Sequence, residues 1–151
     1  MQLNFLILTA FTAAVGASAI PHELGFTYKN NTLEKKEYGV HCDCKGSIMC
    51  ATLKVQACDE AVNFKLIRND AINYGAIGSS APHHGVCHGI GTDFGCAITI
   101  QGHSSCIRTG NDIWWDYQVI RHSGCHHCGH KYWGDGCSTV IDYEPQCGRI
   151  H

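Results

Sequence analysis

The sequence predicts an α+β fold, a two-layer sandwich in which two helices cover one face of an antiparallel sheet and disulfides staple the structure. Three observations predict this class. Strand-like and helix-like segments follow one another in the order β-α-β-β-α-β, the split β-α-β arrangement. The chain has 151 residues, which suits one compact domain. It also contains 11 cysteines, many more than an ordinary intracellular domain of this size.

The expected strands are short and largely apolar. Residues 38–42 form the first strand and run into a cluster of cysteines. Residues 85–90 and 95–100 alternate with a period of two on either side of a Gly-Thr-Asp turn, which predicts a β-hairpin. Residues 139–143 form the last strand, just before Pro145.

The first helix is expected between residues 52 and 68. Thr52 can cap its N-terminus, and one face repeats at helical spacing through Leu53, Ala57, Ala61 and Phe64 or Lys65. Residues 69–82 are rich in Asn, Gly, Ser and Pro, so we expect a loop there.

The second helix has the clearest signals. Asn111 is its expected N-terminal cap, and Asp112 complements the helix dipole in the first turn. Arg121 suits the last turn, and Gly124 can end the helix in the left-handed conformation. The apolar stripe that should face the sheet comprises Ile113, Trp114, Tyr117 and Ile120. A glycine-rich loop is expected between this helix and the last strand.

The N-terminal part predicts a secreted, extracellular protein. Residues 1–19 have the uncharged apolar stretch and the small-residue ending of a signal peptide, with a buried N-terminal helix as the alternative. Residues 20–37 are polar and carry the only glycosylation sequon, at Asn30. Lys35-Lys36 leaves two interpretations open, a propeptide processed at this dibasic site and an uncleaved surface segment. The folded domain is expected at residues 38–151.

Charge and hydropathy exclude several classes of protein. The formal net charge is −2 at pH 7, so the chain lacks the basic footprint of a nucleic-acid-binding protein. No second long apolar run occurs, so we expect no stable membrane insertion. We expect a monomer without metal or cofactor.

Cysteine motifs flank the two predicted helices. Cys44 and Cys50 bracket a Cys-Lys-Gly-Ser-Ile-Met-Cys sequence before the first helix. Cys125 and Cys128 belong to a Cys-His-His-Cys-Gly sequence after the second helix. A Gly-Asp loop, the Thr-Val-Ile-Asp-Tyr strand and a final cysteine follow.

With these motifs the chain resembles the fungal killer toxins related to the virus-encoded killer protein four. The resemblance spans roughly residues 38–147 and is more specific at its ends than in its middle. For the matching positions it implies three disulfides: Cys44–Cys125, Cys50–Cys128 and Cys87–Cys147. The other five cysteines cannot all pair within one chain. A Cys42–Cys137 link is conceivable, and Cys58, Cys96 and Cys106 remain unassigned.

The resemblance implies a secreted toxin or antifungal effector rather than an enzyme. Its partner would be a surface or membrane protein of competing or host cells, with a calcium channel as the example from the family. The family prototype has basic residues just before the cysteine that matches Cys87, where this chain has His83-His84. Lys45 and Lys131 adjoin the cysteine cluster, so the expected target contacts are Lys45, His83, His84 and Lys131.

The chain also contains 11 histidines, whose protonation would change the formal net charge from −2 to +9. Because unperturbed imidazoles titrate near pH ~6.5, we expect binding to cell surfaces to strengthen in mildly acidic surroundings.

Four other interpretations stay open. One is a non-toxic effector that binds an extracellular host protein. A second is a redox pair at Cys125 and Cys128. A third is a zinc site, for which the candidate ligands are Cys125, His126, His127, Cys128 and His130. The fourth is a secreted hydrolase whose acid–base groups would come from His83, His84, His88, His103, Asp93 and Glu60.

Overall fold

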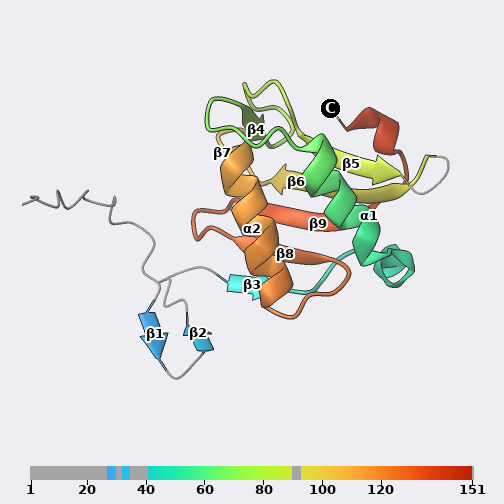
Figure 1. Ribbon diagram of the computed structural model, residues 1–151. Helices are drawn as coiled ribbons and strands as arrows, with labels where there is room; N and C mark the ends of the chain where they lie inside the picture. Colours follow the sequence, from blue (N-terminus) through green and yellow to red (C-terminus); the bar gives the residue numbers. More distant parts are fainter. Residues whose placement is uncertain (1–26, 30–31, 35–40, 90–92, 151) are drawn as a thin grey trace, which may run out of the picture. The chain divides into compact units, whose positions relative to one another are not determined.

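The computed structural model describes residues 27–29, 32–34, 41–89 and 93–150 (Figure 1). Contacts divide the chain into two units, Met1–Glu37 and Tyr38–His151. In the first unit, β1 (Thr27–Lys29) pairs antiparallel with β2 (Thr32–Glu34). The predicted signal peptide, Asn30 and the Lys35-Lys36 pair lie outside the described residues.

The second unit is built on a five-stranded antiparallel sheet with the strand order β3-β8-β9-β6-β5. Its strands are β3 (His41–Asp43), β5 (Gly85–Gly89), β6 (Gly95–Gln101), β8 (Gly129–Tyr132) and β9 (Ser138–Glu144). The longest ladder joins β6 to β9 and places Ile98 opposite Ile141 in the core. The predicted hairpin is confirmed as β5 and β6. Because β6 pairs with both β5 and β9, the hairpin leaves β5 at an outer edge of the sheet.

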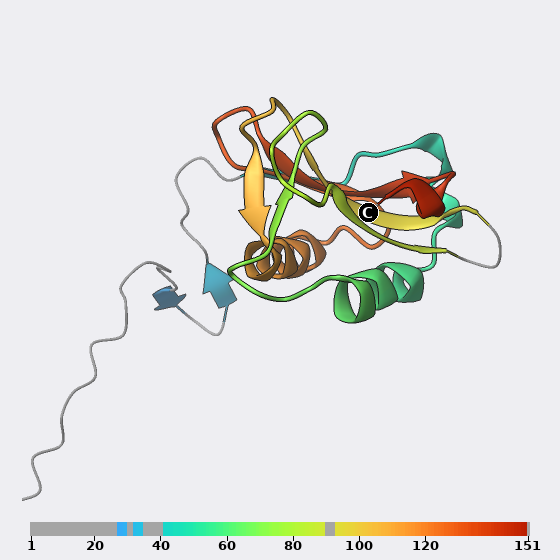
Figure 2. The same ribbon diagram turned by 90° about the horizontal axis from the view of Figure 1, so that it is seen from above.

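Two helices, α1 (Val55–Glu60) and α2 (Gly110–His122), lie on the same face of the sheet (Figure 2). Ile113 and Ile120 of α2 and Val62 after α1 are completely buried against the strands. The structure therefore has the predicted disulfide-stapled α+β architecture. Within the part of the chain that the structure describes, no helix is long and apolar enough to cross a membrane.

The first helix differs from the prediction for residues 52–68. Thr52 ends a short 3₁₀ helix, η1 (Ile48–Thr52), and its hydroxyl donates to the Met49 carbonyl, so it does not cap α1. After Glu60 the helix widens into a π-helical turn, η2 (Ala61–Lys65). This wider turn changes which side chains face the core, and Phe64 is 80% exposed.

The second helix begins slightly earlier than predicted. Its cap is Thr109, whose side chain accepts from the Asp112 amide while the Asp112 carboxylate accepts from the Thr109 amide. Asn111 instead lies inside the helix and donates to Asp70. Gly124 follows the helix with φ 96°, as its predicted left-handed role requires.

Three strands of the second unit were not predicted, and neither were β1 and β2 of the first unit. The polar sequence Gly-His-Lys-Tyr forms β8, which the glycine-rich pattern suggested was a loop. The short strands β4 (Asn73–Gly75) and β7 (Ile107–Thr109) pair with each other outside the main sheet. β4 falls within the predicted loop at residues 69–82, where three residues are too few to produce a strand pattern. β3 begins at His41, and residues 38–40 lie outside the described residues.

Five disulfides stabilise the second unit: Cys44–Cys125, Cys50–Cys128, Cys58–Cys96, Cys87–Cys147 and Cys106–Cys137. Three of them are the pairs that the killer-toxin resemblance implied. The conceivable Cys42–Cys137 link is wrong, because Cys137 bonds to Cys106. Cys58–Cys96 joins α1 directly to β6, which holds the helix layer against the sheet.

Candidate functional site

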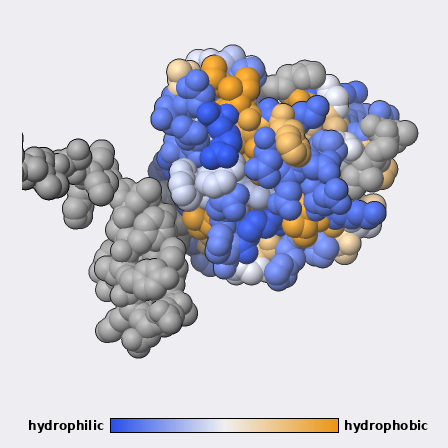
Figure 3. Space-filling view, viewed as in Figure 1, coloured by the Kyte–Doolittle hydropathy of each residue, from blue (hydrophilic) through white to orange (hydrophobic). Residues whose placement is uncertain are grey.

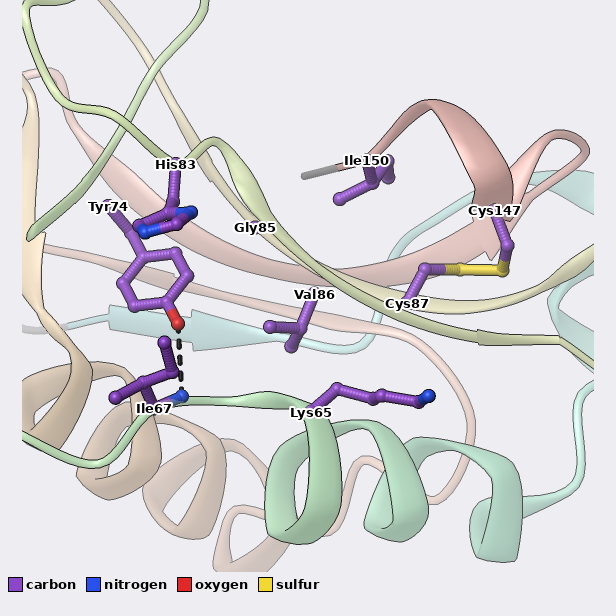
Figure 4. Close-up of a pocket in the computed structure, with 9 residues that line it drawn as sticks. All are labelled: Lys65, Ile67, Tyr74, His83, Gly85, Val86, Cys87, Cys147 and Ile150. Carbon is purple, nitrogen blue, oxygen red and sulfur yellow. Dashed lines mark hydrogen bonds between the residues drawn. A yellow bond between two sulfur atoms is a disulfide. The ribbon is translucent and has the colours of Figure 1, made fainter.

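A pocket of about 420 Å³ lies beside β5, the outer strand of the main sheet. Figure 4 shows β5 running between the helix layer on one side and the C-terminal turn η3 (Cys147–Arg149) on the other. The lining residues are Lys65, Ile67, Tyr74, His83, Gly85, Val86, Cys87, Cys147 and Ile150. The pocket is therefore assembled from three segments between residues 65 and 87 and from the C-terminal turn.

The position of the C-terminal wall is set by a disulfide. Cys87 on β5 bonds to Cys147, and the Cys147 amide donates to the Asp93 carbonyl over 2.6 Å. These two bonds hold the turn against the strand, so that Ile150 reaches the pocket. On β5 itself, a Cβ atom at Gly85 would lie 2.4 Å from the Ile98 carbonyl oxygen, so close pairing with β6 requires glycine there.

Tyr74 and His83 lie side by side at one end of the pocket (Figure 4). Their ring centroids are 5.1 Å apart, and the Gly75 amide donates to the His83 carbonyl over 2.8 Å. The Tyr74 hydroxyl accepts from the Ile67 amide over 3.0 Å (Figure 4). Burial of this side chain raises its pKa above the ordinary value of a tyrosine. The hydroxyl consequently stays protonated and keeps its own hydrogen available for donation.

The pocket combines basic groups with apolar walls. Among its described lining residues, Lys65 and His83 are the two basic side chains and none carries a carboxylate. Ile67, Val86 and Ile150 supply apolar surface. An ammonium group, an imidazole and a protonated phenol suit a ligand group that carries negative charge beside an apolar part.

A second pocket, of about 210 Å³, lies at the other end of β5. Here the Nε2 atom of His88 is 2.7 Å from Oε2 of Glu60, and the Gln56 amide donates to Oε1 of the same carboxylate over 2.8 Å. Both oxygens of Glu60 are therefore engaged. Lys54, Ala57 and Gly89 complete the lining.

The expected target contacts do not form one surface. Lys45 follows β3, at the opposite edge of the sheet from β5, and its side chain is 83% exposed. His83 lines the larger pocket, whereas the neighbouring His84 places Nδ1 3.1 Å from the Gly75 carbonyl oxygen. Lys131 is a wrong prediction as a target contact, because its side chain is only 8% exposed and pairs with Asp116 beneath α2.

The hydrolase candidates are also dispersed, apart from one pair. His88 and Glu60 meet across β5 and α1. His103 lies near a different loop, where its Nε2 atom is 3.3 Å from the Asp135 carbonyl oxygen. The larger pocket contains His83 but neither Asp93 nor Glu60.

The zinc and redox interpretations both fail because the cysteines that they require form disulfides with other partners. Cys125 and Cys128 bond to Cys44 and Cys50, so neither thiolate is available to a metal and the two do not bond to each other. Among the described residues, two further clusters of metal-ligand type both contain disulfide-bonded cysteines.

Sequence reasoning missed Lys65 and Tyr74 as site residues. Lys65 was assigned to the face of a continuous helix, and the π-helical turn instead places it beside β5. Tyr74 lay in a predicted loop, and only the pairing of β4 with β7 places it in the pocket. No local signal distinguishes either residue.

Outside the two pockets, exposed apolar side chains include Phe64 and Trp115. In the view of Figure 3, apolar residues form separate patches on a largely hydrophilic surface. The pockets beside β5 are therefore the better candidate for a binding site.

Residues 42–147 match the MU117 meiotically up-regulated gene family. The chain belongs to this family. The matched region contains all 11 cysteines and all residues that line the larger pocket except Ile150. No curated protein and no solved structure matches the chain.

Proposed function

We propose that this chain is a secreted, killer-toxin-like protein that binds the surface of competing or host cells and inhibits or perturbs them. A membrane protein such as a calcium channel is the proposed target. The single observation that carries this proposal is the cysteine pairing. Cys44–Cys125, Cys50–Cys128 and Cys87–Cys147 are the pairs that the resemblance to killer toxins implies.

Secretion is supported by the number of disulfides. Five bridges in one small domain are typical of proteins that fold in an oxidising compartment. The apolar, uncharged sequence of residues 1–19 is that of a signal peptide.

A binding role is supported by the pocket beside β5. Lys65, His83 and the Tyr74 hydroxyl offer donors to an acidic group, and the pocket walls are otherwise apolar or backbone. This arrangement favours recognition of a partner over catalysis, since no carboxylate accompanies His83 among the described lining residues.

The experiment is to apply the purified, oxidised protein to a panel of fungal and plant cells. Surface binding is measured with labelled protein, growth by turbidity, and calcium entry with an indicator dye. We expect saturable binding and reduced growth in at least one cell type, with reduced calcium entry in the same cells. A Cys44→Ser/Cys125→Ser variant serves as a control that lacks one of the three implied disulfides.

Each result decides between the candidates. Saturable binding without growth inhibition would favour the non-toxic effector, and an absence of binding to every cell type would contradict both proposals. Growth inhibition without a change in calcium entry would exclude the channel as the target while keeping the toxin.

One observation favours a second candidate, a His-dependent hydrolase. His88 and Glu60 lie in hydrogen-bonding contact beside the smaller pocket, as an imidazole base and its orienting carboxylate would. RNA and polysaccharide turnover by the same protein tests this candidate. Turnover that disappears in His88→Gln would replace the toxin proposal with an enzyme.

A further inference from the structure

Both pockets border the same strand, and that strand has an open edge. β5 is the last strand of the main sheet and pairs only with β6. Among the described residues, the backbone of Gly85–Gly89 makes no hydrogen bond to any other segment. In an antiparallel pair, every second residue directs its amide and carbonyl away from the neighbouring strand. β5 therefore presents unpaired backbone donors and acceptors.

This edge carries none of the charges, prolines or bulges that block strand addition at many sheet edges. Protected edges carry outward charges, proline or a bulge. β5 has the sequence Gly-Val-Cys-His-Gly and pairs with β6 residue for residue, without a bulge. Val86 is buried in the core, Cys87 is bonded to Cys147 and His88 contacts Glu60, so its side chains are committed elsewhere. The backbone is what this edge offers to a partner.

The two pockets extend along the whole strand. The larger pocket is lined by Gly85, Val86 and Cys87, and the smaller pocket by His88 and Gly89. At roughly 3.3 Å per residue, the five residues of β5 span about 16 Å, which fits an extended segment of similar length. A partner strand would direct alternate side chains toward the two sides of β5. In the larger pocket these sides are the helix layer with Lys65 and the C-terminal turn with Ile150 (Figure 4).

The charge of the two pockets specifies the partner further. Apart from His88, which contacts Glu60, their described basic side chains are Lys54, Lys65 and His83. Among the described residues that line them, Glu60 carries the only carboxylate, and both of its oxygens already contact neighbouring side chains. A strand with acidic side chains would meet complementary charge, whereas a basic strand would meet like charge.

We propose that β5 binds an extended, acidic segment of a partner protein, which joins the main sheet as a sixth strand. Main-chain hydrogen bonds would hold the segment, and the pockets would select its side chains. This inference deepens the proposed function and rests on it in one respect, that the protein acts by binding a partner.

The test uses the purified, oxidised protein and two pools of acetylated, amidated heptapeptides. In one pool, β-branched residues alternate with Asp or Glu, and in the other they alternate with Lys or Arg. Binding is followed by amide chemical shifts and by hydrogen exchange. We expect the acidic pool to shift the amides of β5 and to slow their exchange, with an effect at least fivefold stronger than that of the basic pool. Equal effects of the two pools, or no effect on β5, would overturn the proposal.

Matched variants separate charge from strand pairing. Lys65→Glu should weaken the best acidic peptide at least fivefold, whereas Lys45→Glu, at the opposite edge of the sheet, should leave its affinity unchanged. Two further versions of this peptide carry N-methyl groups, one at the odd positions and one at the even positions. Only the version whose methyl groups block the amides that face β5 should lose binding. Binding that survives in both versions would exclude a sixth strand. The growth assay reports separately on the proposed function.

Discussion

The ammonium group of Lys131 lies 2.5 Å from Oδ1 of Asp116, and the two side chains are only 8% and 4% exposed. The Thr139 hydroxyl donates to Oδ2 of the same carboxylate. The pair joins β8 to the middle of α2, and Thr139 adds a contact from β9. A charge that the sequence suggested for target binding is therefore part of the core.

This pair predicts an asymmetric response to mutation. Lys131→Met should lower the free energy of unfolding by about 3–5 kcal/mol, because it leaves the Asp116 carboxylate buried without its counter-ion. The double variant Lys131→Met/Asp116→Leu should recover most of that loss, since no buried charge remains. Urea denaturation with the disulfides intact measures both. As a control, Lys45→Met at an exposed position should stay within about 0.5 kcal/mol of the parent. A double variant as unstable as the single variant would contradict this interpretation.

The cap of α2 predicts a second stability difference. Thr109→Ala should cost about 1 kcal/mol, because it removes the side chain that accepts from the Asp112 amide. Asn111→Ala should have a smaller effect, because Asn111 makes an exposed contact to Asp70 and does not cap the helix. Thermal or urea unfolding of the two variants compares them directly. If Asn111→Ala proved the more damaging, the cap would have to be reassigned.

The disulfides should contribute according to the length of chain that they close. Cys44–Cys125 spans 81 residues and Cys106–Cys137 spans 31. In the chain-entropy model these loops correspond to about 4.5 and about 3.7 kcal/mol. Replacing both cysteines of each pair by serine tests the order, with the first variant less stable than the second. Peptide mapping of the parent under non-reducing, acidic conditions should recover all five pairs, and a different pairing of Cys44 or Cys50 would undo the argument for a killer-toxin-like framework.

Tyr117 predicts a distinctive alkaline titration. Burial, and then the hydrogen bond from its hydroxyl to Asp59, raise the pKa of Tyr117 above the ordinary value of 10.0. The unfolded chain can ionise this phenol at a pH where the folded chain cannot. The site therefore contributes stability below the ordinary tyrosine pKa, and this contribution is lost as the pH rises from that value toward the raised one.

The measurement is the phenolate absorbance of native and denatured protein near pH ~10, where an ordinary tyrosine titrates. Tyr117→Phe should leave the native signal in this range unchanged and reduce the denatured signal. An equal decrease in both states would show that Tyr117 ionises normally in the fold.

The histidines predict that binding depends on pH and salt. Protonation of all 11 would raise the formal net charge from −2 to +9, and model imidazoles titrate near pH ~6.5. Binding to the target cells should therefore be stronger at pH ~5 than at pH ~7.5, and added salt should weaken the increase. Equal binding at the two pH values would remove the histidines as the source of attraction.

Much of the local structure could be predicted from the sequence. The apolar stripe of α2 and the alternation of β5 and β6 each lie within a few neighbouring residues, so their patterns identify them. β8 could not be predicted, because its lysine is buried only when Asp116 of α2 is opposite it. That residues 52–68 do not form one continuous helix could likewise not be predicted, since this depends on a π-helical turn and on a disulfide from η1 to Cys128.

The residues around β5 illustrate which features short segments encode and which depend on pairing between distant segments. The order of the two helices and of β3, β5, β6 and β9, with the central hairpin, could be predicted from periodicities within short segments, and the resemblance to killer toxins implied three of the five disulfides. The edge position of β5, the places of Lys65 and Tyr74 beside it and the burial of Lys131 depend on the three-dimensional fold. The reason is physical: an open edge and a buried charge are defined by which distant segments pair, and long-range pairing leaves no pattern within any one segment.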